Sequence, residues 1–196
     1  MGRRAFVFLS VLFFTTIAAG CQDGTGPGEF VVTGHIQNNT QAPIPADARL
    51  LAVWGVSSGT PDYSYVFGEG TIDRIRGTFQ IRFDQAPPLA ALNAGEVGVA
   101  LLVATTNQSW TDGDSLGSSS DYSGVIGLTG QHAVIFMRSD TAAQLCGWCA
   151  TFGQGYSVGV GVEVPDEVFD IFVPASRSSP VLIIDDLASI KVVNWT

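Results

Sequence analysis

Apolar and polar residues alternate with a period of two along much of this chain, and that period constrains the fold more than any other feature. The clearest stretch runs from Gly77 to Asp84, where Phe79, Ile81 and Phe83 fall on one face and polar residues fall on the other. Successive side chains of a β-strand point to opposite faces, so this pattern predicts a strand with one buried face.

Further β-rich runs are separated by stretches rich in Gly, Pro, Asn and Ser. These runs are Phe30–Ile36, Leu50–Val56, Tyr63–Phe67, Val97–Thr105, Ala133–Arg138, Tyr156–Val164, Val168–Val173, Val181–Ile184 and Ile190–Trp195. Helical patterning is limited to Leu89–Ala94 and Thr141–Leu145. About nine to ten short strands with such punctuation predict an all-β fold, a single antiparallel β-sandwich of the immunoglobulin-like kind over residues 29–196.

The start of this domain carries a more specific pattern. Val32–Ile36 has a V-x-G-x-I spacing, and Pro45–Leu50 has a proline-bearing turn followed by A-x-L. The pattern resembles the first hairpin of transthyretin-like and carboxypeptidase-regulatory-like sandwiches. The resemblance implies that these two strands pair as a hairpin, and it carries over no functional residue.

Charge excludes one class of partner. The 196 residues hold 9 basic and 18 acidic side chains, a net charge of −9, and 46% of them are hydrophobic. Nucleic-acid binding needs a basic surface to neutralise phosphates, so we expect no nucleic-acid partner. The apolar fraction predicts an ordinary packed core.

The N-terminus has the features of a targeting segment. Arg3 and Arg4 precede the apolar run Ala5–Ala19, which is shorter than the roughly 20 residues that span a bilayer as a helix. The sequence therefore predicts a signal peptide over residues 1–20, not a permanent transmembrane helix.

The end of that segment, Ile17-Ala18-Ala19-Gly20-Cys21, has small residues before a cysteine. It resembles the lipobox of bacterial lipoproteins, in which the cysteine is lipidated with fatty acyl chains such as palmitate and becomes the first residue. The resemblance implies a membrane anchor at Cys21. Residues 21–28 would be the lipidated cysteine and a flexible tether, and Gln22 in place of aspartate favours the outer membrane of the cell envelope.

Cys146 and Cys149 are the residues of the domain with the greatest potential for covalent or metal chemistry. A C-x-x-C spacing is compatible with a disulfide, a redox-active pair or part of a metal site. No βαβ pattern surrounds the pair and no further ligands have matching spacing, so we favour a local disulfide in the oxidising envelope.

Two serine motifs are typical of hydrolases. Gly155–Gly159 has the G-x-S-x-G spacing of a nucleophile elbow, and Gly113–Leu116 spells the GDSL signature of esterases. An elbow needs a helix after it and a histidine further downstream. The residues after Ser157 continue a β pattern, and both histidines, His35 and His132, precede it. We therefore expect a glycine-rich strand and no catalytic residue.

The polar stretch over residues 107–124 contains candidate ligand-binding groups. Asp112, Asp114 and Asp121 are a weak candidate Ca²⁺ site, although the glutamate of an EF-hand loop is missing. Aromatic side chains in or beside loops stack on sugar rings in carbohydrate-binding sandwiches. The candidates for such a platform are Trp110, Trp148, Tyr63, Tyr65 and Tyr122.

Taken together, these patterns predict a lipid-anchored envelope protein with a non-catalytic β domain that binds, scaffolds or supports other components and needs no cofactor. Its expected partners are the membrane, through the lipid, and an envelope protein or a glycan. A carbohydrate- or ligand-binding module, with or without Ca²⁺, is the alternative function. A secreted hydrolase comes third.

Overall fold

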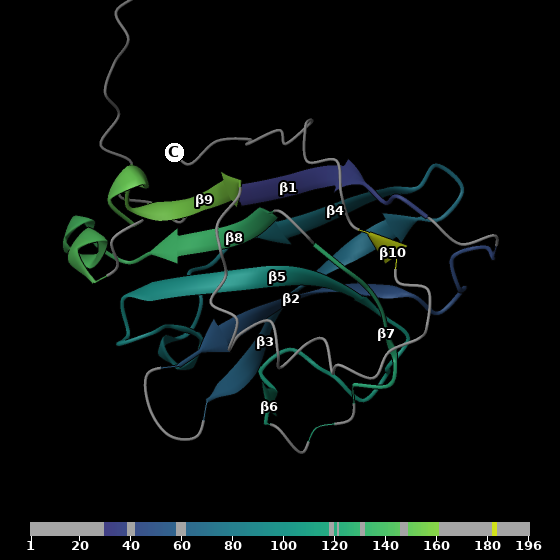
Figure 1. Ribbon diagram of the computed structural model, residues 1–196, viewed down its shortest axis with the longest axis horizontal. Coiled ribbons are helices and arrows are strands. Elements are labelled where there is room, and N and C mark those ends of the chain that lie inside the picture. Colours follow the sequence, from purple (N-terminus) through teal and green to yellow (C-terminus); the bar gives the residue numbers. More distant parts are fainter. Residues whose placement is uncertain are drawn as a thin grey trace, which may run out of the picture.

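The described part of the chain, in a computed structural model, comprises residues 30–38, 42–57, 62–117, 120, 122–129, 132–145, 149–160 and 182–183 (Figure 1). It is all-β, as predicted, and three short 3-10 turns are its only helical elements. The strands are β1 Phe30–His35, β2 Arg49–Val56, β3 Tyr63–Asp73, β4 Thr78–Phe83, β5 Val97–Thr105, β6 Ser115–Leu116, β7 Val125–Leu128, β8 His132–Met137, β9 Gly155–Val160 and β10 Leu182–Ile183. The 3-10 turns are η1 Leu89–Ala91, η2 Asp140–Gln144 and η3 Cys149–Thr151.

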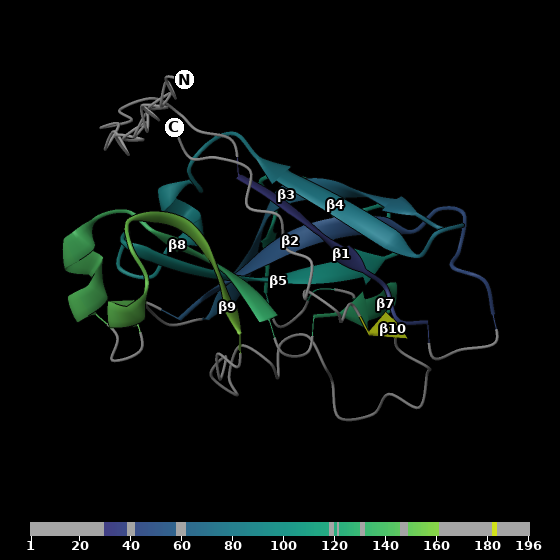
Figure 2. The same cartoon turned by 90° about the horizontal axis from the view of Figure 1, so that it is seen from above.

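All ten strands belong to one hydrogen-bonded sheet. Its main path runs β1-β4-β3-β2-β5-β7-β10, with β8 pairing β5, β9 pairing β8 and β6 pairing β3. The pairs are antiparallel except β7 with β10. The sheet curls until it is nearly closed into a barrel-like shape (Figures 1 and 2).

The prediction that the first two strands pair with each other as a hairpin is wrong. β1 pairs with β4, Phe30 opposite Phe83 and His35 opposite Thr78, whereas β2 lies between β3 and β5. The two strands have the expected local sequence, but β1 pairs with a partner more distant along the chain. This non-local pairing brings the turn between β3 and β4 beside the segment that follows β1.

A main core fills the space inside the curled sheet. It takes alternate residues from β1, β2, β4, β5, β8 and β9, in keeping with the period of two in the sequence. Tyr156 lies at its aromatic centre, with its ring centroid 4.9 Å from that of Phe83 and 5.2 Å from that of Phe30. Trp54 is fully buried nearby, and a side chain at Gly98 would collide with its ring at 2.7 Å. These contacts join β1 and β4 to β9 across the interior.

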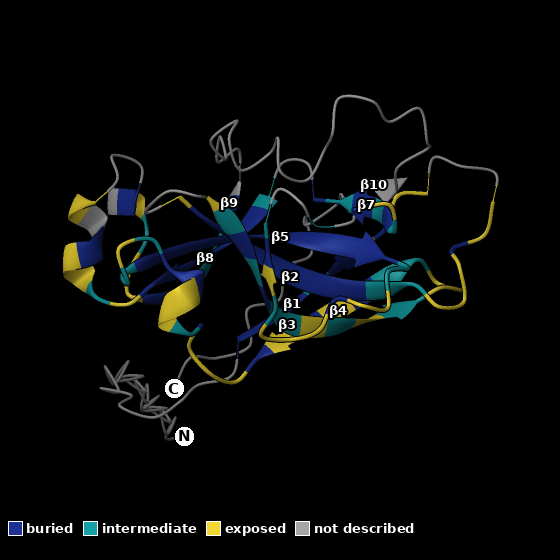
Figure 3. Ribbon diagram, turned by 90° about the horizontal axis from the view of Figure 1, so that it is seen from below, coloured by how far each residue is buried: buried dark blue, intermediate teal, exposed yellow. Residues whose placement is uncertain are grey.

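The outer face of the sheet is also covered. β5 is buried along its whole length and β2 along nearly all of its own (Figure 3). Trp110, Leu116 and Tyr122 cover the outer face of β2 and β5, while the segment around η2 and η3 covers that of β8. β2 and β5 therefore lie between two apolar layers, which explains their continuous apolar sequences.

Most of the predicted strands are confirmed. Val97–Thr105 matches β5 at both ends, and the two predicted helical segments are the 3-10 turns η1 and η2. β6 and β7 were not predicted, and β3 extends to Asp73. The predicted strands Val168–Val173 and Ile190–Trp195 lie outside the described residues, as does the signal peptide. Within the described ranges, no helix has the length and apolarity needed to cross a membrane.

Candidate functional site

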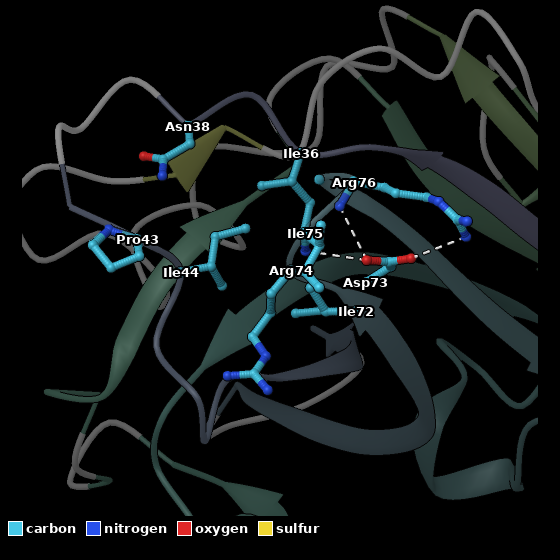
Figure 4. Close-up of a pocket in the computed structure, with 10 residues that line it drawn as sticks. Ile36, Asn38, Pro43, Ile44, Ile72, Asp73, Arg74, Ile75 and Arg76 are labelled. Atoms are coloured by element: carbon cyan, nitrogen blue, oxygen red, sulfur yellow. Dashed lines mark hydrogen bonds and ion pairs between the residues drawn. The ribbon is translucent and has the colours of Figure 1, made fainter.

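A groove opens at the end of the sheet where β1 finishes. Ile36, Asn38, Pro43 and Ile44, which follow β1 in the chain, line one side, and the turn from β3 to β4 lines the other (Figure 4). Its volume is about 720 Å³, within the range of ligand-binding pockets. The described lining residues are Ile36, Asn38, Pro43, Ile44, Ile72, Asp73, Arg74, Ile75, Arg76 and Gly77.

The turn wall is shaped by hydrogen bonds within its own sequence. The Asp73 carboxylate accepts hydrogen bonds from the backbone N–H of Ile75 at 3.1 Å and of Arg76 at 3.0 Å. Aspartate is favoured in turns because its short side chain can accept such bonds. Gly77 then takes a positive φ of 63°, which glycine adopts without steric cost.

One backbone bond ties the two walls together. The N–H of Ile36 donates to the carbonyl of Gly77 at 2.7 Å, extending the β1–β4 ladder into the groove. The side chain of Asn38 donates to the carbonyl of Ala42 at 2.8 Å. The groove is therefore held by bonds on both sides of its opening.

The groove combines a buried apolar side with an exposed apolar rim. Ile36 and Ile44 are 7% and 9% exposed and belong to the main core, and Ile72 packs against it. Ile75 at the tip of the turn is 98% exposed, the highest value among the large hydrophobic residues of the described chain. The edge of the main core and the exposed Ile75 therefore line the same groove.

Two arginines flank Ile75 on the turn, and their side chains extend to opposite sides (Figure 4). The Arg76 guanidinium reaches the Asp73 carboxylate at 3.4 Å but remains 81% exposed. Hydrogen bonds from the Arg76 and Ile75 backbone N–H groups, together with the Arg76 charge, hold the pKa of Asp73 below its ordinary value. Asp73 is therefore an ionised, internally bonded part of the turn.

The structure buries two of the aromatic residues predicted to form a stacking platform. Trp110 and Tyr122 are 3% and 9% exposed, and their rings pack edge to face with centroids 5.4 Å apart. Burial also raises the pKa of the Tyr122 phenol. Both rings fill the layer that covers the outer face of the sheet, so neither presents an open face for stacking on a ligand.

The other predicted aromatics do not converge with them. Tyr63 is half-buried and its hydroxyl donates to the carbonyl of Ala90 at 2.6 Å. Tyr65 packs against the main core. Trp148 lies outside the described residues.

The two described aspartates of the weak Ca²⁺ candidate bind neighbouring protein groups. Asp112 accepts from the backbone N–H of Gly68 at 2.8 Å. Asp114 accepts from the backbone N–H of Thr111 at 2.7 Å and from its hydroxyl at 3.0 Å. Asp121 lies outside the described residues, and no cluster of three potential metal ligands occurs among those described.

The two serine motifs lie in strands. Ser157 is in β9 opposite Ile135 of β8, so the prediction of a glycine-rich strand at Gly155–Gly159 is confirmed. Ser115 is in β6 opposite Tyr65. Neither serine starts the helix that follows a nucleophile elbow.

The C-x-x-C pair is described only in part. Cys149 is fully buried in a small core on the outer face of β8. Cys146 lies outside the described residues, as does Cys21, so the disulfide and the lipid site remain predictions.

The groove itself was not predicted. The only sequence feature that points to it is the turn Asp73-Arg74-Ile75-Arg76-Gly77, in which an isoleucine lies between two arginines. A turn between two strands is exposed, so an isoleucine there is unusual. The opposite wall could not be inferred, because it depends on the pairing of β1 with β4. No protein-family model, no curated protein and no solved structure matches this chain.

Proposed function

We propose that the chain is a lipid-anchored protein of the bacterial cell envelope whose β domain works by binding a partner in the groove between Ile36 and Ile75, without a catalytic centre. Cys21 carries the lipid, and residues 22–28 form the tether to the domain. The acyl chains hold the protein at the membrane, since several chains on one residue give stable anchoring.

The observation that carries the binding role is the exposure of Ile75. Ile75 is 98% exposed, and it lies in a groove that is also lined by buried isoleucines and by two arginines. Concave sites with apolar lining and a few polar groups are the usual places where ligands bind. A scaffolding or structural role would use the same contact.

Photo-crosslinking in intact cells tests the binding role. Ile75 is replaced by the photo-reactive residue p-benzoylphenylalanine, and Leu89, which is 58% exposed on η1 and away from the groove, is replaced in a matched control. We expect an adduct of defined mass from position 75 and none from position 89. Equal labelling at both positions, or none at 75, would contradict the proposal.

Cell fractionation tests the anchor separately. The Cys21→Ser variant loses the lipidation site, so we expect the mature protein to move from the outer-membrane fraction to the soluble fraction. Recovery of the variant in the membrane fraction would rule out the lipid anchor. Gln22→Asp in the wild-type background is the control for sorting, and we expect it to retain the lipid while shifting the protein to the inner membrane.

The disulfide between Cys146 and Cys149 is part of the same proposal, because an exported domain matures in an oxidising compartment. The ring it closes is short, so its contribution to stability falls at the low end of the usual range of about 0–5 kcal/mol. Intact-mass measurement before and after reduction tests it. We expect a gain of two hydrogen masses, and a protein already reduced after export would exclude the bond.

A further inference from the structure

We infer that the partner in the groove is an acidic segment of another polypeptide, with an aliphatic side chain next to its carboxylates. This inference rests on the proposed binding function and adds the chemistry of the partner. It follows from the charge of the turn, from the position of Ile75, and from the bonding of Asp73.

The arginines differ in how many of their N–H donors bind groups of the described chain. Arg49 binds both carboxylate oxygens of Glu69, at 2.9 and 2.8 Å, and donates a third bond to the carbonyl of Trp110 at 2.9 Å. Arg74 makes no hydrogen bond or ion pair with any described residue, and Arg76 has one ion pair, at 3.4 Å. In a chain of net charge −9, this turn thus presents two guanidinium groups with unused donors. Guanidinium groups bind carboxylates well because their fork of N–H donors matches the two oxygens.

The position of Ile75 favours a polypeptide over a small molecule. All four isoleucines line the groove, but Ile36 and Ile44 are buried whereas Ile75 is 98% exposed. A compact ligand packed against the buried isoleucines would leave most of the Ile75 side chain in water. An extended segment that passes over the turn can bury one side chain in the groove and also cover Ile75, because its alternate residues point the same way.

The bonding of Asp73 disfavours a basic partner. Among the described residues that line the groove, Asp73 is the only acidic one, and its carboxylate already accepts from two backbone N–H groups and from Arg76. Those bonds already compensate part of the Asp73 charge, and a lysine or arginine of a partner would lie beside two positive charges. An acidic partner is instead attracted by the two guanidinium groups.

Selection from a library of random dodecapeptides tests the inference. The target is the mature chain with Cys21→Ser, which removes the lipid. The groove variant carries Arg74→Gln and Ile75→Ser. The matched control carries Arg138→Gln and Leu89→Ser, which removes the same charge and similar apolar area from exposed positions elsewhere.

We expect the enriched peptides to contain Asp or Glu next to Ile, Leu or Val. The affinity of the best peptide should fall about tenfold or more in the groove variant, which corresponds to at least 1.4 kcal/mol, and stay within about twofold in the control. Binding should also weaken at high salt, since exposed ion pairs are screened.

Three results would overturn the inference. They are enrichment of basic or uncharged peptides, equal binding by the groove variant, and no enrichment while the crosslink at position 75 still forms. In the third case anionic lipid vesicles and a size measurement of the crosslinked product identify the occupant as a membrane or a second copy. Each of these results leaves the proposed binding role standing, whereas a missing crosslink at position 75 removes the binding role itself.

Discussion

The two ends of the β1–β4 pair differ in how far the chain itself buries their apolar side chains. At the Phe30–Phe83 end, the rings contact Tyr156, and the Tyr156 hydroxyl donates to the carbonyl of Gln85 at 2.7 Å. At the other end, beyond His35 and Thr78, the turn leaves Ile75 in solvent. The first end buries its apolar groups within the chain, whereas the second leaves one exposed.

This difference separates residues that stabilise the fold from residues available for binding. Burying an apolar side chain contributes roughly 1.5–3 kcal/mol, so the aromatic end accounts for a large share of the stability. Ile75 contributes almost none of that energy within the chain, because 98% of its surface stays exposed. Substitutions at the two ends should therefore have opposite effects on stability and on binding.

The largest effect on stability is expected from Trp54→Ala. Trp54 is fully buried, packs against Phe83 and Tyr156, and donates its indole N–H to the carbonyl of Phe67 at 2.8 Å. Removing a buried aromatic ring leaves a cavity, so the free energy of unfolding should fall by about 3–5 kcal/mol. Urea denaturation measures the change. A loss below about 1 kcal/mol would show that the aromatic end does not hold the fold.

A smaller loss is expected from Gly77→Ala in the turn. Gly77 has a φ of 63°, and an added Cβ would lie 3.4 Å from the carbonyl oxygen of Ile36. An L-residue in this conformation costs roughly 1–2 kcal/mol, which should appear in the same denaturation experiment. Gly117→Ala is the matched control, because a Cβ there meets nothing within 4 Å and its φ is not positive. Equal losses in the two variants would mean that the turn conformation is not required.

The sequence predicted the long apolar strands of this fold but not its shortest strands. The strand β2 around Trp54 was predictable from its continuous apolar run, and β5 for the same reason. β6 has two residues and β7 four, too few for a period to be recognised, and both depend on pairing with distant strands. The polar stretch over residues 107–124 looked like an exposed loop because its buried aromatics are separated by many polar residues.

The groove was not predictable for a related reason. The turn wall follows from a local sequence, since Asp73 and Gly77 are turn-forming residues. The other wall comes from residues about 30–40 positions earlier along the chain, and only the non-local β1–β4 pairing brings it close. Local patterns predict strands and turns, whereas the site depends on which strands pair.

A smaller, pH-dependent effect is expected from Asp73. The pKa of Asp73 is lower in the folded chain than in the unfolded chain, where it is about 3.9. The contribution of Asp73 to stability is therefore present above the unfolded pKa and is lost as the pH falls through the folded pKa. Unfolding curves of the wild type and Asp73→Ala should therefore differ at neutral pH and converge in acid. A difference that stays constant down to the acid limit would show that the Asp73 charge is not involved.

The smallest effect on stability is expected from Ile75→Ser. Exposed positions away from caps, cores and networks usually change the free energy of unfolding by less than about 0.5 kcal/mol, and Ile75 has almost no buried surface to lose. The same substitution should weaken peptide binding in the groove, because it removes the apolar rim while Arg74 and Arg76 remain. Leu89→Ser, at a less exposed residue on η1, should leave both quantities unchanged. If Ile75→Ser instead destabilised the fold as much as Gly77→Ala, Ile75 would belong with the structural residues of the aromatic end, and the distinction between the two ends would fail.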